Sequence, residues 1–468
     1  MRNKKNIIHE NISITAISSE GYGIARIEGK VIFAEACIPG DVADVKIYKS
    51  KASYEEGKAI AIKSPSFDRV EPFCSHFGTC GGCKWQYATY EAQLKYKQEI
   101  VKSAFDRIAK VSLDNILPIV GCDETKYYRN KLEYTFSNKK WLTLEQVESG
   151  DENIVRDACG FHIPGLFDKV VDVDHCYLQG SISNDLRNAI KSFCIDQHYS
   201  FYDIREQKGF LRNLVVKTAS TGQVLVMLVV GEDNDEKIEK VMRFIIDKFP
   251  SIDSLQYMIN TKRNDSTYDL DAITYKGNAY IIEEFGAKKF KIGAKSFFQT
   301  NSRQGKHLYD IIKDFASLKK TDTVYDLYTG VGSIAIYLAD DCKQMIGVEE
   351  VKEAIIDANE NKLLNQQTNC QFYTGDVKNI INSDLYDAHG RPDVIITDPP
   401  RSGMHEKVVM ELLHLEASTI VYVSCNPSTQ ARDIALLNEK YDVTKMQPVD
   451  MFPHTKHIEN VALLKLRK

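Results

Sequence analysis

The sequence predicts an α/β protein whose C-terminal third is a doubly wound, mostly parallel, Rossmann-like sheet. Three observations support this fold class. From about Ser296 onward, strand-like apolar stretches alternate with helical stretches, which is the order of a parallel sheet covered on both faces. The first 65 or so residues are short alternating stretches separated by glycine turns. The segment between them is rich in strands and also has helical stretches.

Length and composition indicate several globular domains. A chain of 468 residues is too long for one hydrophobic core. We expect an OB-like barrel over residues 1–66, an α+β central domain over 67–295 and the Rossmann-like domain over 296–468. No apolar run reaches the roughly 18–20 residues that span a membrane, and the N-terminus does not resemble a signal peptide. A cytoplasmic monomer without an obligate protein partner is the default expectation. The net charge of −5 neither favours nor excludes a nucleic-acid partner.

The N-terminal barrel is predicted from about five short strands. Apolar and polar residues alternate over 12–18, 23–27, 30–36, 41–50 and 55–62, with turn glycines between several of these stretches. This spacing is typical of a small closed barrel. Such barrels often bind single-stranded or looped nucleic acid, although a purely structural cap fits the pattern nearly as well.

The middle of the chain begins with a helix and continues with strands. A helix is predicted over about 90–110, and its expected apolar face holds Leu94, Val101, Ala104, Phe105 and Ile108. Residues 211–219 and 223–230 flank Ser220-Thr221-Gly222 as a hairpin. Further strands are expected over 256–263 and 279–285, and a polar loop or insertion over 144–156.

The C-terminal strands are expected over 323–328, 344–349, 371–376, 393–400 and 419–425, with a closing pair near Tyr441 and Val461. The first of them runs into the glycine loop 326–332, where the backbone can approach a ligand and the next helix offers its N-terminus. The second ends at Glu349, a carboxylate suited to a ribose diol.

An NAD site has similar features. However, Ala335 stands where the dinucleotide fingerprint has its last glycine, and the fourth strand ends in Asp398-Pro399-Pro400. Together these signals favour S-adenosylmethionine over NAD.

Cys425 ends the fifth predicted strand, where a reacting group would face the cofactor; a buried structural thiol is the alternative. Near the C-terminus, Glu459 follows His454 and His457 and begins an apolar strand, so it is a candidate base with a raised pKa. The two histidines fit structural roles equally well. Methylation of a uracil carbon 5 requires a thiolate, a base and a methyl donor. The thiolate adds to carbon 6 and makes carbon 5 electron-rich, and the base then removes the carbon 5 proton before the thiolate leaves.

These residues resemble the RNA 5-methyluridine methyltransferases. Five motifs carry the resemblance: SFFQTNSRQ (296–304), DLYTGVGS (326–333), DPPRSG (398–403), SCNPSTQARD (424–433) and MFPHTKHIE (451–459). In addition, YRNKLEYTF (128–136) is similar to a strand motif of that family's central domain, and residues 21–42 resemble the TRAM RNA-binding barrel. Nearly the full chain is covered.

The resemblance implies a class I methyltransferase domain with S-adenosylmethionine as methyl donor. It implies Cys425 as the nucleophile, Glu459 as the base, and a cofactor site made by Gln299, Tyr328, Glu349 and Asp398. Tyr328-Thr329 replaces the more usual Phe-Cys, and Ser333 stands where Asn is often found. Neither departure affects the mechanism.

The clustered cysteines bear on the choice of RNA. Cys74, Cys80 and Cys83, with Cys176 far downstream, are similar to the iron–sulfur ligands of the family's ribosomal-RNA branch. Four thiolates hold either a 4Fe–4S cluster or zinc, and Cys159 competes with Cys176 as the fourth ligand. Because the tRNA branch usually lacks both barrel and cluster, 23S rRNA is favoured over tRNA. The barrel, the basic helix 90–110 and Arg129-Asn130-Lys131 are expected to contact the phosphates, although the basic face of the helix also fits a solvated surface.

Other functions remain open on sequence grounds. An RNA cytosine-5 methyltransferase shares the thiolate chemistry but usually has its cysteine in another context. An iron–sulfur RNA-binding protein with an inactive methyltransferase site would not need Cys425, Glu459 and Asp398. A dehydrogenase leaves the Cys425 and Glu459 motifs unexplained.

Overall fold

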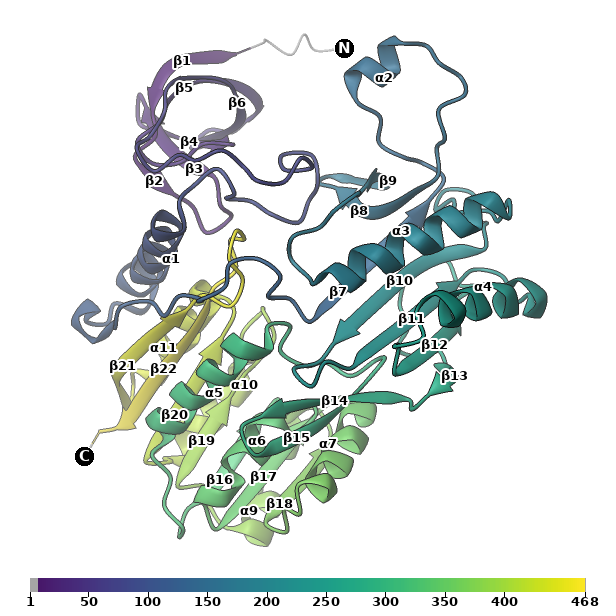
Figure 1. The fold of residues 1–468 in the computed structure, drawn as a ribbon. Helices are drawn as coiled ribbons and strands as arrows, with labels where there is room; N and C mark the ends of the chain where they lie inside the picture. Colours follow the sequence, from purple (N-terminus) through teal and green to yellow (C-terminus); the bar gives the residue numbers. More distant parts are fainter. Residues whose placement is uncertain (1–6, 468) are drawn as a thin grey trace.

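The computed structural model describes residues 7–467. Its N-terminal part is a six-stranded sheet of order β1-β5-β6-β4-β3-β2 that curls into a barrel (Figure 1). Alternate side chains such as Ile32, Ala34 and Val45 fill its interior. The predicted barrel is confirmed, with six strands in place of five: β1 (Ile8–Ser13), β2 (Ala16–Ile17), β3 (Gly23–Ile27), β4 (Lys30–Glu35), β5 (Val42–Ser50) and β6 (Tyr54–Ser64).

Helix α1 (Tyr90–Ala104) and a following π-helical turn (Phe105–Ala109) form the predicted helix. They pack against the C-terminal sheet, since Val101 and Phe105 belong to the same core cluster as Ile420. The predicted apolar face is wrong at one end, because Ile108 is 41% exposed. A π turn adds a residue to the helical turn and rotates the later side chains out of phase. A short 3-10 helix (Leu113–Asn115) comes next.

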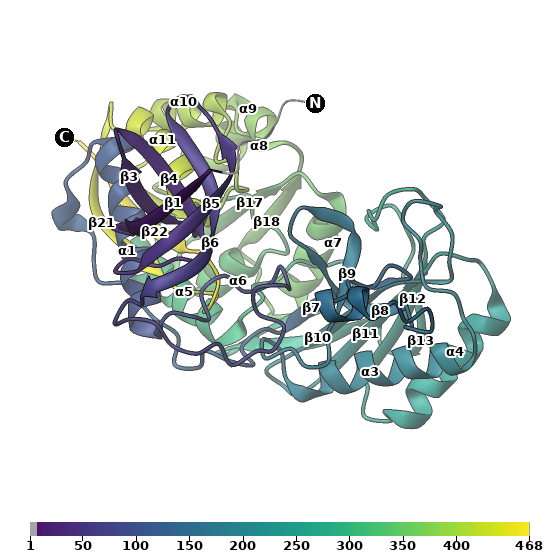
Figure 2. The same cartoon turned by 90° about the horizontal axis from the view of Figure 1, so that it is seen from above.

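The central part is a seven-stranded sheet of order β13-β12-β11-β10-β7-β8-β9. The predicted hairpin is confirmed as the antiparallel pair β10–β11. Helices α3 and α4 lie side by side along one face (Figures 1 and 2), and the rings of Phe193 and Phe244 stack between them at 4.1 Å. The elements are β7 (Lys131–Ser137), α2 (Leu144–Glu148), β8 (Ala158–Ile163), β9 (Leu166–Asp172), α3 (Ser181–Asp196), β10 (Leu211–Thr218), β11 (Val224–Val230), α4 (Asp235–Lys248), β12 (Ser254–Ile259) and β13 (Ile273–Gly277).

A two-stranded hairpin, β14 (Tyr280–Phe285) and β15 (Lys288–Gly293), connects the two large sheets. The opposite face of the central sheet contributes Met227 and Met258 to a core cluster that also holds Phe285 and C-terminal residues such as Val421. The predicted domain boundaries at residues 66 and 295 stay predictions. Helix α1 lies within the range expected for the central domain, but it packs on the C-terminal sheet.

The C-terminal sheet has the order β18-β17-β16-β19-β20-β22-β21, parallel from β18 to β20 and antiparallel at β22 and β21. Consecutive residues of β16 face opposite cores, Val324 towards α5 and Tyr325 towards α10 and α11. This confirms the doubly wound fold. Its elements are α5 (Ser302–Ala316), β16 (Thr323–Leu327), α6 (Ser333–Leu338), a 3-10 turn (Ala339–Asp341), β17 (Gln344–Glu349), α7 (Lys352–Leu364), β18 (Cys370–Thr374), α8 (Val377–Ile380), α9 (Ser383–His389), β19 (Val394–Thr397), α10 (Glu406–Leu415), β20 (Thr419–Ser424), α11 (Pro427–Leu437), β21 (Tyr441–Val449) and β22 (Glu459–Leu466).

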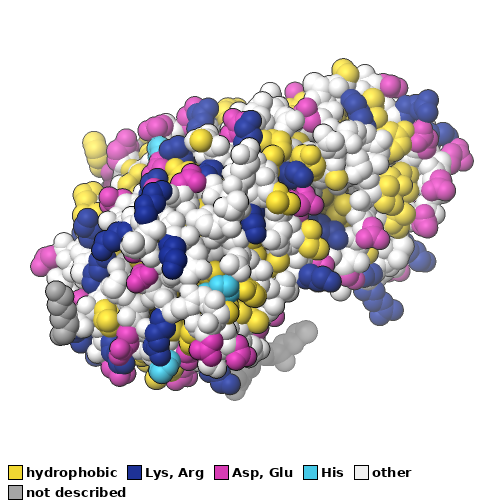
Figure 3. Space-filling model, turned by 90° about the horizontal axis from the view of Figure 1, so that it is seen from below, with side chains coloured by type: hydrophobic (Ala, Val, Ile, Leu, Met, Phe, Trp, Pro, Cys, Tyr) yellow, Lys and Arg dark blue, Asp and Glu magenta, His cyan; other side chains and the backbone are white. Residues whose placement is uncertain are grey.

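Two surface properties bear on function. Within residues 7–467, every helix is too short or too polar to cross a membrane. On the face shown in Figure 3, Lys and Arg side chains are interspersed with Asp and Glu rather than gathered into one large basic area. On this face, binding of a polyanion would therefore depend on local groups.

Candidate active site

Five of the six predicted catalytic and cofactor residues lie in a row along one edge of the C-terminal sheet. In the strand order β17-β16-β19-β20-β22, each strand presents one of them at this edge. Leu327 pairs with both Val348 and Thr397, Thr397 pairs with Tyr422, and Ser424 pairs with Asn460, so Cys425 and Glu459 extend about two residues beyond Asp398 at the same edge. The row therefore reads Glu349, Tyr328, Asp398, Cys425 and Glu459. It crosses the switch point between β16 and β19, where open α/β sheets bind ligands.

The glycine loop after β16 is shaped by positive backbone angles. Tyr328 has φ +65°, and Gly330 and Gly332 have φ +55° and +73°. A Cβ on Gly332 would approach Phe372 Cζ to 2.8 Å, whereas a Cβ on Gly330 would meet nothing within 4 Å. Gly332 is thus required by packing, and Gly330 faces open space that a ligand can use.

Glu349 is held at this loop by two backbone amides. Gly330 N donates to Glu349 Oε2 at 3.1 Å, and Val351 N donates to Glu349 Oε1 at 2.9 Å. The carboxylate is fixed beside the glycine loop, as expected of a group that binds a ribose diol.

Asp326, which is buried, and Asp398, which is half-buried, form an acidic pair at the switch point. Burial, with a smaller contribution from the other carboxylate, raises the pKa of Asp398 to about 7, and burial also raises the pKa of Asp326 to about 7. Thr329 Oγ1 donates to Asp326 Oδ2 at 2.5 Å, while Asp326 Oδ1 is buried without a partner. Two desolvated carboxylates with an unpartnered oxygen fit a positively charged ligand. The sulfonium and ammonium groups of S-adenosylmethionine meet this requirement.

Gln299, the sixth predicted residue, comes from the segment before α5. It is 8% exposed. Asn130 Nδ2 donates to Gln299 O at 2.8 Å and to Ser302 Oγ at 2.7 Å. Asn301 caps α5 and donates from Nδ2 to Met451 O at 3.0 Å. The segment is therefore pinned between the central sheet and the loop that leads to Glu459.

Cys425 lies half-buried between the end of β20 and the start of α11. Asn426 caps that helix, and its Nδ2 donates to Arg401 O at 3.0 Å. Burial raises the pKa of the Cys425 thiol to about 11, and the charges of Glu459 and Asp398 add to this effect. The Arg401 guanidinium acts in the opposite direction, through its charge and a hydrogen bond.

Glu459 is 8% exposed at the first position of β22. Burial raises the pKa of its carboxyl well above the ordinary value, Asp398 raises it further and Arg401 lowers it. A desolvated carboxyl next to a desolvated thiol and one arginine is suited to proton transfer. Sequence reasoning assigned Arg401 no role, although it lies in the DPPRSG motif.

The two histidines near Glu459 are neutral at ordinary pH. Arg401 Nη2 donates to His457 Nδ1 at 2.9 Å, so the ring proton of His457 lies on Nε2. Burial lowers the pKa of His457 to about 4, and it does the same for His454. His454 has φ +64° and is packed edge-on against Phe73 at 5.0 Å. These contacts favour structural roles for both histidines.

The loop that delivers Glu459, residues 450–458, is held by the N-terminal half of the chain. Lys97 Nζ donates to Asp450 Oδ1 at 2.6 Å, and both side chains are fully buried. Gln93 Oε1 accepts from His454 N at 2.8 Å, and Tyr128 OH donates to Pro453 O at 2.9 Å. The backbone amides of Lys84 and Trp85 donate to His454 O. The active-site loop thus rests on α1 and on the segment that carries the cysteines.

The four predicted metal ligands line one cavity. They are Cys74, Cys80, Cys83 and Cys176. Cys159, the competing fourth ligand, is fully buried in β8 and is not among the lining residues. Burial raises the pKa of Cys80 to about 11 and that of Cys83 to about 12, and Gly82 N donates to Cys80 Sγ at 3.4 Å. Within residues 7–467, no three potential ligands lie at metal-binding spacing. Four cysteines that line one cavity nevertheless have the chemistry to hold a thiolate-bound group.

Two family models match the chain. The model described as tRNA (uracil-5-)-methyltransferase matches residues 279–467, and the TRAM domain model matches residues 10–60. These ranges cover the C-terminal sheet with its residue row and most of the N-terminal barrel.

Full-length relatives show the same similarity. An uncharacterized RNA methyltransferase of Bacteroides thetaiotaomicron is 48% identical over 96% of this chain and 100% of its own length. A second, from Porphyromonas gingivalis, is 48% identical over 97% of this chain and 99% of its own length. The crystal structure of the Pyrococcus abyssi tRNA (uracil-54, C5)-methyltransferase in complex with S-adenosyl-L-homocysteine has a TM-score of 0.73 and 26% identity, covering 97% of this chain and 100% of that one.

Proposed function

The chain belongs to the RNA (uracil-5-)-methyltransferase family, and from this premise we propose that Cys425 and Glu459 perform the reaction on a uridine of 23S rRNA. Membership makes it an S-adenosylmethionine-dependent enzyme that acts on RNA. The proposal adds the nucleophile, the base, the cofactor residues and the substrate molecule.

In the first step, the Cys425 thiolate adds to carbon 6 of the uracil ring, and the electron pair of the carbon 5–carbon 6 double bond moves into an enolate. Arg401 assists because it lowers the pKa of the Cys425 thiol. Target uridines in folded RNA must be accessible in a loop or extruded to reach such a half-buried thiol.

Bound S-adenosylmethionine would supply an electrophilic methyl group for carbon 5. Tyr328, Glu349 and Asp398 would hold it along the sheet edge, with Gln299 facing from the segment before α5. Asp398 lies between Tyr328 and Cys425 in the strand order, so it is the cofactor residue next to the proposed nucleophile.

After methyl transfer, carbon 5 carries both a hydrogen and a methyl group. The Glu459 carboxylate accepts that proton, the carbon 5–carbon 6 double bond forms again and the carbon 6–sulfur bond breaks. Cys425 leaves as a thiolate and the ring is restored. The raised pKa of Glu459 makes its carboxylate a stronger base for this step.

One observation carries the proposal: neighbouring strands place Asp398, Cys425 and Glu459 side by side at the cofactor edge. The test is release of tritium from carbon-5-labelled uridine in unmodified 23S rRNA. Release should require S-adenosylmethionine and should be lost in Cys425→Ala. Release that persists in Cys425→Ala contradicts the assigned nucleophile.

A tRNA substrate is the second candidate, because the Pyrococcus enzyme that matches this chain over 97% of its length is named for a tRNA uridine. Unmodified tRNA assayed in parallel decides between the two. The cysteine cavity favours ribosomal RNA, whereas the barrel does not discriminate, because the similarity to the Pyrococcus tRNA enzyme covers 97% of this chain. Release from tRNA alone would overturn that choice and leave the chemistry unchanged.

A 4Fe–4S cluster on Cys74, Cys80, Cys83 and Cys176 is also part of the proposal, with zinc as the alternative occupant. Protein purified without oxygen should contain about four iron and four sulfide per chain. Zinc without sulfide would identify the other occupant. Cys176→Ser should lower the metal content, whereas Cys194→Ser, at a buried cysteine on α3 outside the cavity, should not.

A further inference from the structure

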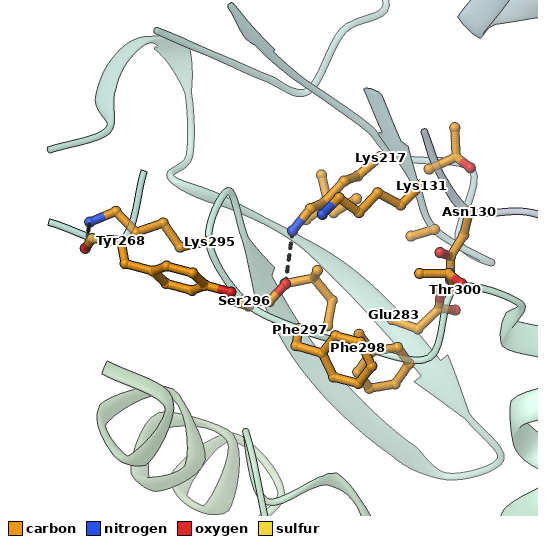
Figure 4. Close-up of a pocket in the computed structure, with 14 residues that line it drawn as sticks. Asn130, Lys131, Lys217, Tyr268, Glu283, Lys295, Ser296, Phe297, Phe298 and Thr300 are labelled. Carbon is orange, nitrogen blue, oxygen red and sulfur yellow. Dashed lines mark hydrogen bonds between the residues drawn. The ribbon is translucent and has the colours of Figure 1, made fainter. Parts of the chain in front are cut away.

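Three lysines and two exposed rings line a pocket between the central sheet and the C-terminal part (Figure 4). Lys131 and Lys217 come from β7 and β10, and Lys295 follows β15. The rings are Tyr268, 72% exposed, and Phe297, 70% exposed. Exposed rings beside cations are a common arrangement in single-stranded nucleic-acid sites.

The charges of Asp357 and Glu133 reach Lys217, but the three lysines of this pocket make no direct contact with a carboxylate among the described residues. Lys217 is only 3% exposed, and its Nζ donates to Gly293 O at 2.7 Å and Ser296 O at 2.9 Å. An ammonium has three donors, so one remains for a ligand. Among the described residues, none of the three lysines forms an ion pair with a carboxylate, and Lys295 donates to Tyr268 O at 3.1 Å. Burial lowers the pKa of Lys217 to about 7, and Lys131 adds to this effect.

Glu283, the carboxylate among the residues that line the pocket, already accepts hydrogen bonds at both of its oxygens. Its oxygens accept from Ser220 N at 3.0 Å, from Glu284 N at 3.2 Å and from Ser302 Oγ at 2.5 Å. In Figure 4 it lies beside Thr300, away from Tyr268. The lysine side of the pocket is therefore free to take an anion.

The pocket adjoins the proposed cofactor site. Phe298 and Thr300, which line it, flank Gln299 in the chain. Asn130 also lines it and binds the same segment, through Gln299 O at 2.8 Å and from its own amide to Thr300 O at 2.9 Å. A chain of nucleotides that enters the active site is thus within reach of this pocket.

We propose that this pocket binds a nucleotide of the RNA substrate near the methylated uridine. The phosphodiester contacts Lys131, Lys217 and Lys295, and the base stacks on Tyr268. The inference rests on the proposed RNA substrate and adds a subsite outside the catalytic row.

The test measures binding of a single-stranded, uridine-containing RNA over a salt series, in the Cys425→Ala background so that no covalent adduct forms. Lys131→Gln and Lys295→Gln should each weaken binding roughly 3- to 10-fold and reduce the salt slope by about 0.7. Tyr268→Ala should weaken binding roughly 5- to 100-fold without changing the slope, and Tyr268→Phe should retain affinity.

Lys248→Gln, on the exposed end of α4, is the matched control and should leave both quantities unchanged. Unchanged affinity and slope in Lys131→Gln and Lys295→Gln would overturn the subsite, whatever the catalytic assay shows. Conversely, lysine variants that lose RNA affinity, in an enzyme that releases no tritium, would remove the proposed function and retain the subsite.

Discussion

Arg401 sets the charge balance around Cys425 and Glu459. Its guanidinium lowers the pKa of both groups, against burial and the charge of Asp398, which raise them. In the proposed mechanism both groups must be deprotonated, the thiol for addition and the carboxyl for proton removal. Activity should therefore rise with pH, since the Cys425 pKa is about 11 in the free protein.

Arg401→Gln should move the ascending limb of the pH profile of kcat/KM to higher pH. Removing the cation raises both pKa values, so a larger fraction of each group is protonated at any pH. We expect a shift of up to about one pH unit, because the side chain is solvent-exposed. Arg401→Lys keeps the charge and should shift the limb less. An identical profile in Arg401→Gln would show that the guanidinium does not tune these groups.

At the scale of elements, the glycine loop and the loop 450–458 have different structural roles. The glycine loop leaves room for a ligand at Gly330 and packs tightly at Gly332. The loop 450–458 brings Glu459 to the row and is held from outside its own sheet, by Gln93 and Lys97 of α1. The proposed cofactor site is therefore built locally, whereas the position of Glu459, the proposed base, depends on the N-terminal segments.

The two glycines should respond differently to alanine. Gly332→Ala should destabilise the folded protein, because its Cβ would meet Phe372 at 2.8 Å. Gly330→Ala should cost only about 1–2 kcal/mol of backbone strain but should weaken binding of S-adenosylmethionine. Calorimetric titration and thermal unfolding of both variants separate these effects. Equal cofactor affinity in Gly330→Ala and the natural protein would exclude a ligand at that glycine.

Gln93→Leu should slow proton removal more than thiolate addition, because it removes the acceptor for His454 N and loosens the loop before Glu459. The covalent RNA–protein adduct should then accumulate in denaturing gels, as it should in Glu459→Gln. Glu99→Leu, exposed on the same helix, is the control. Lower turnover without added adduct would assign Gln93 to folding alone.

At the scale of the whole molecule, one buried ion pair joins distant parts of the chain. Lys97 and Asp450 are 353 positions apart and both are fully buried. The pair lies where α1 meets the loop 450–458, and Tyr90, the first residue of α1, donates from its OH to Asp450 Oδ2 at 2.9 Å. A charge left alone there would have no water to solvate it.

Lys97→Met should therefore lower the free energy of unfolding by about 3–5 kcal/mol. Lys97→Met combined with Asp450→Asn should recover part of that loss, because the second change removes the uncompensated charge. Denaturant titrations of the two variants measure the difference. A double variant less stable than Lys97→Met would show that Asp450 acts mainly through its other hydrogen bonds.

Local pattern was enough to predict the strands and the candidate site residues at their ends. Asp398 and Cys425 follow apolar strands of the predicted parallel sheet, so the pattern assigns them to its carboxyl edge, whereas Glu459 begins a strand and joins them because β22 runs antiparallel. Arg401, Gln93 and Lys97 could not be found this way. Lys97 belongs to a helix whose lysines are typical of a solvated surface, and its partner is known only once the chain is folded.

The amino-acid sequence was sufficient for the fold class, the alternation of strands and helices, and the choice of the residues proposed to carry the chemistry, because these depend on short-range periodicity and on motifs contiguous in the chain. Tertiary packing decided which distant groups meet. It placed α1 against the C-terminal sheet, the four cysteines around one cavity and the lysines 131, 217 and 295 around another. These contacts depend on how the separately predicted parts pack, and burial then sets the pKa values of the groups enclosed.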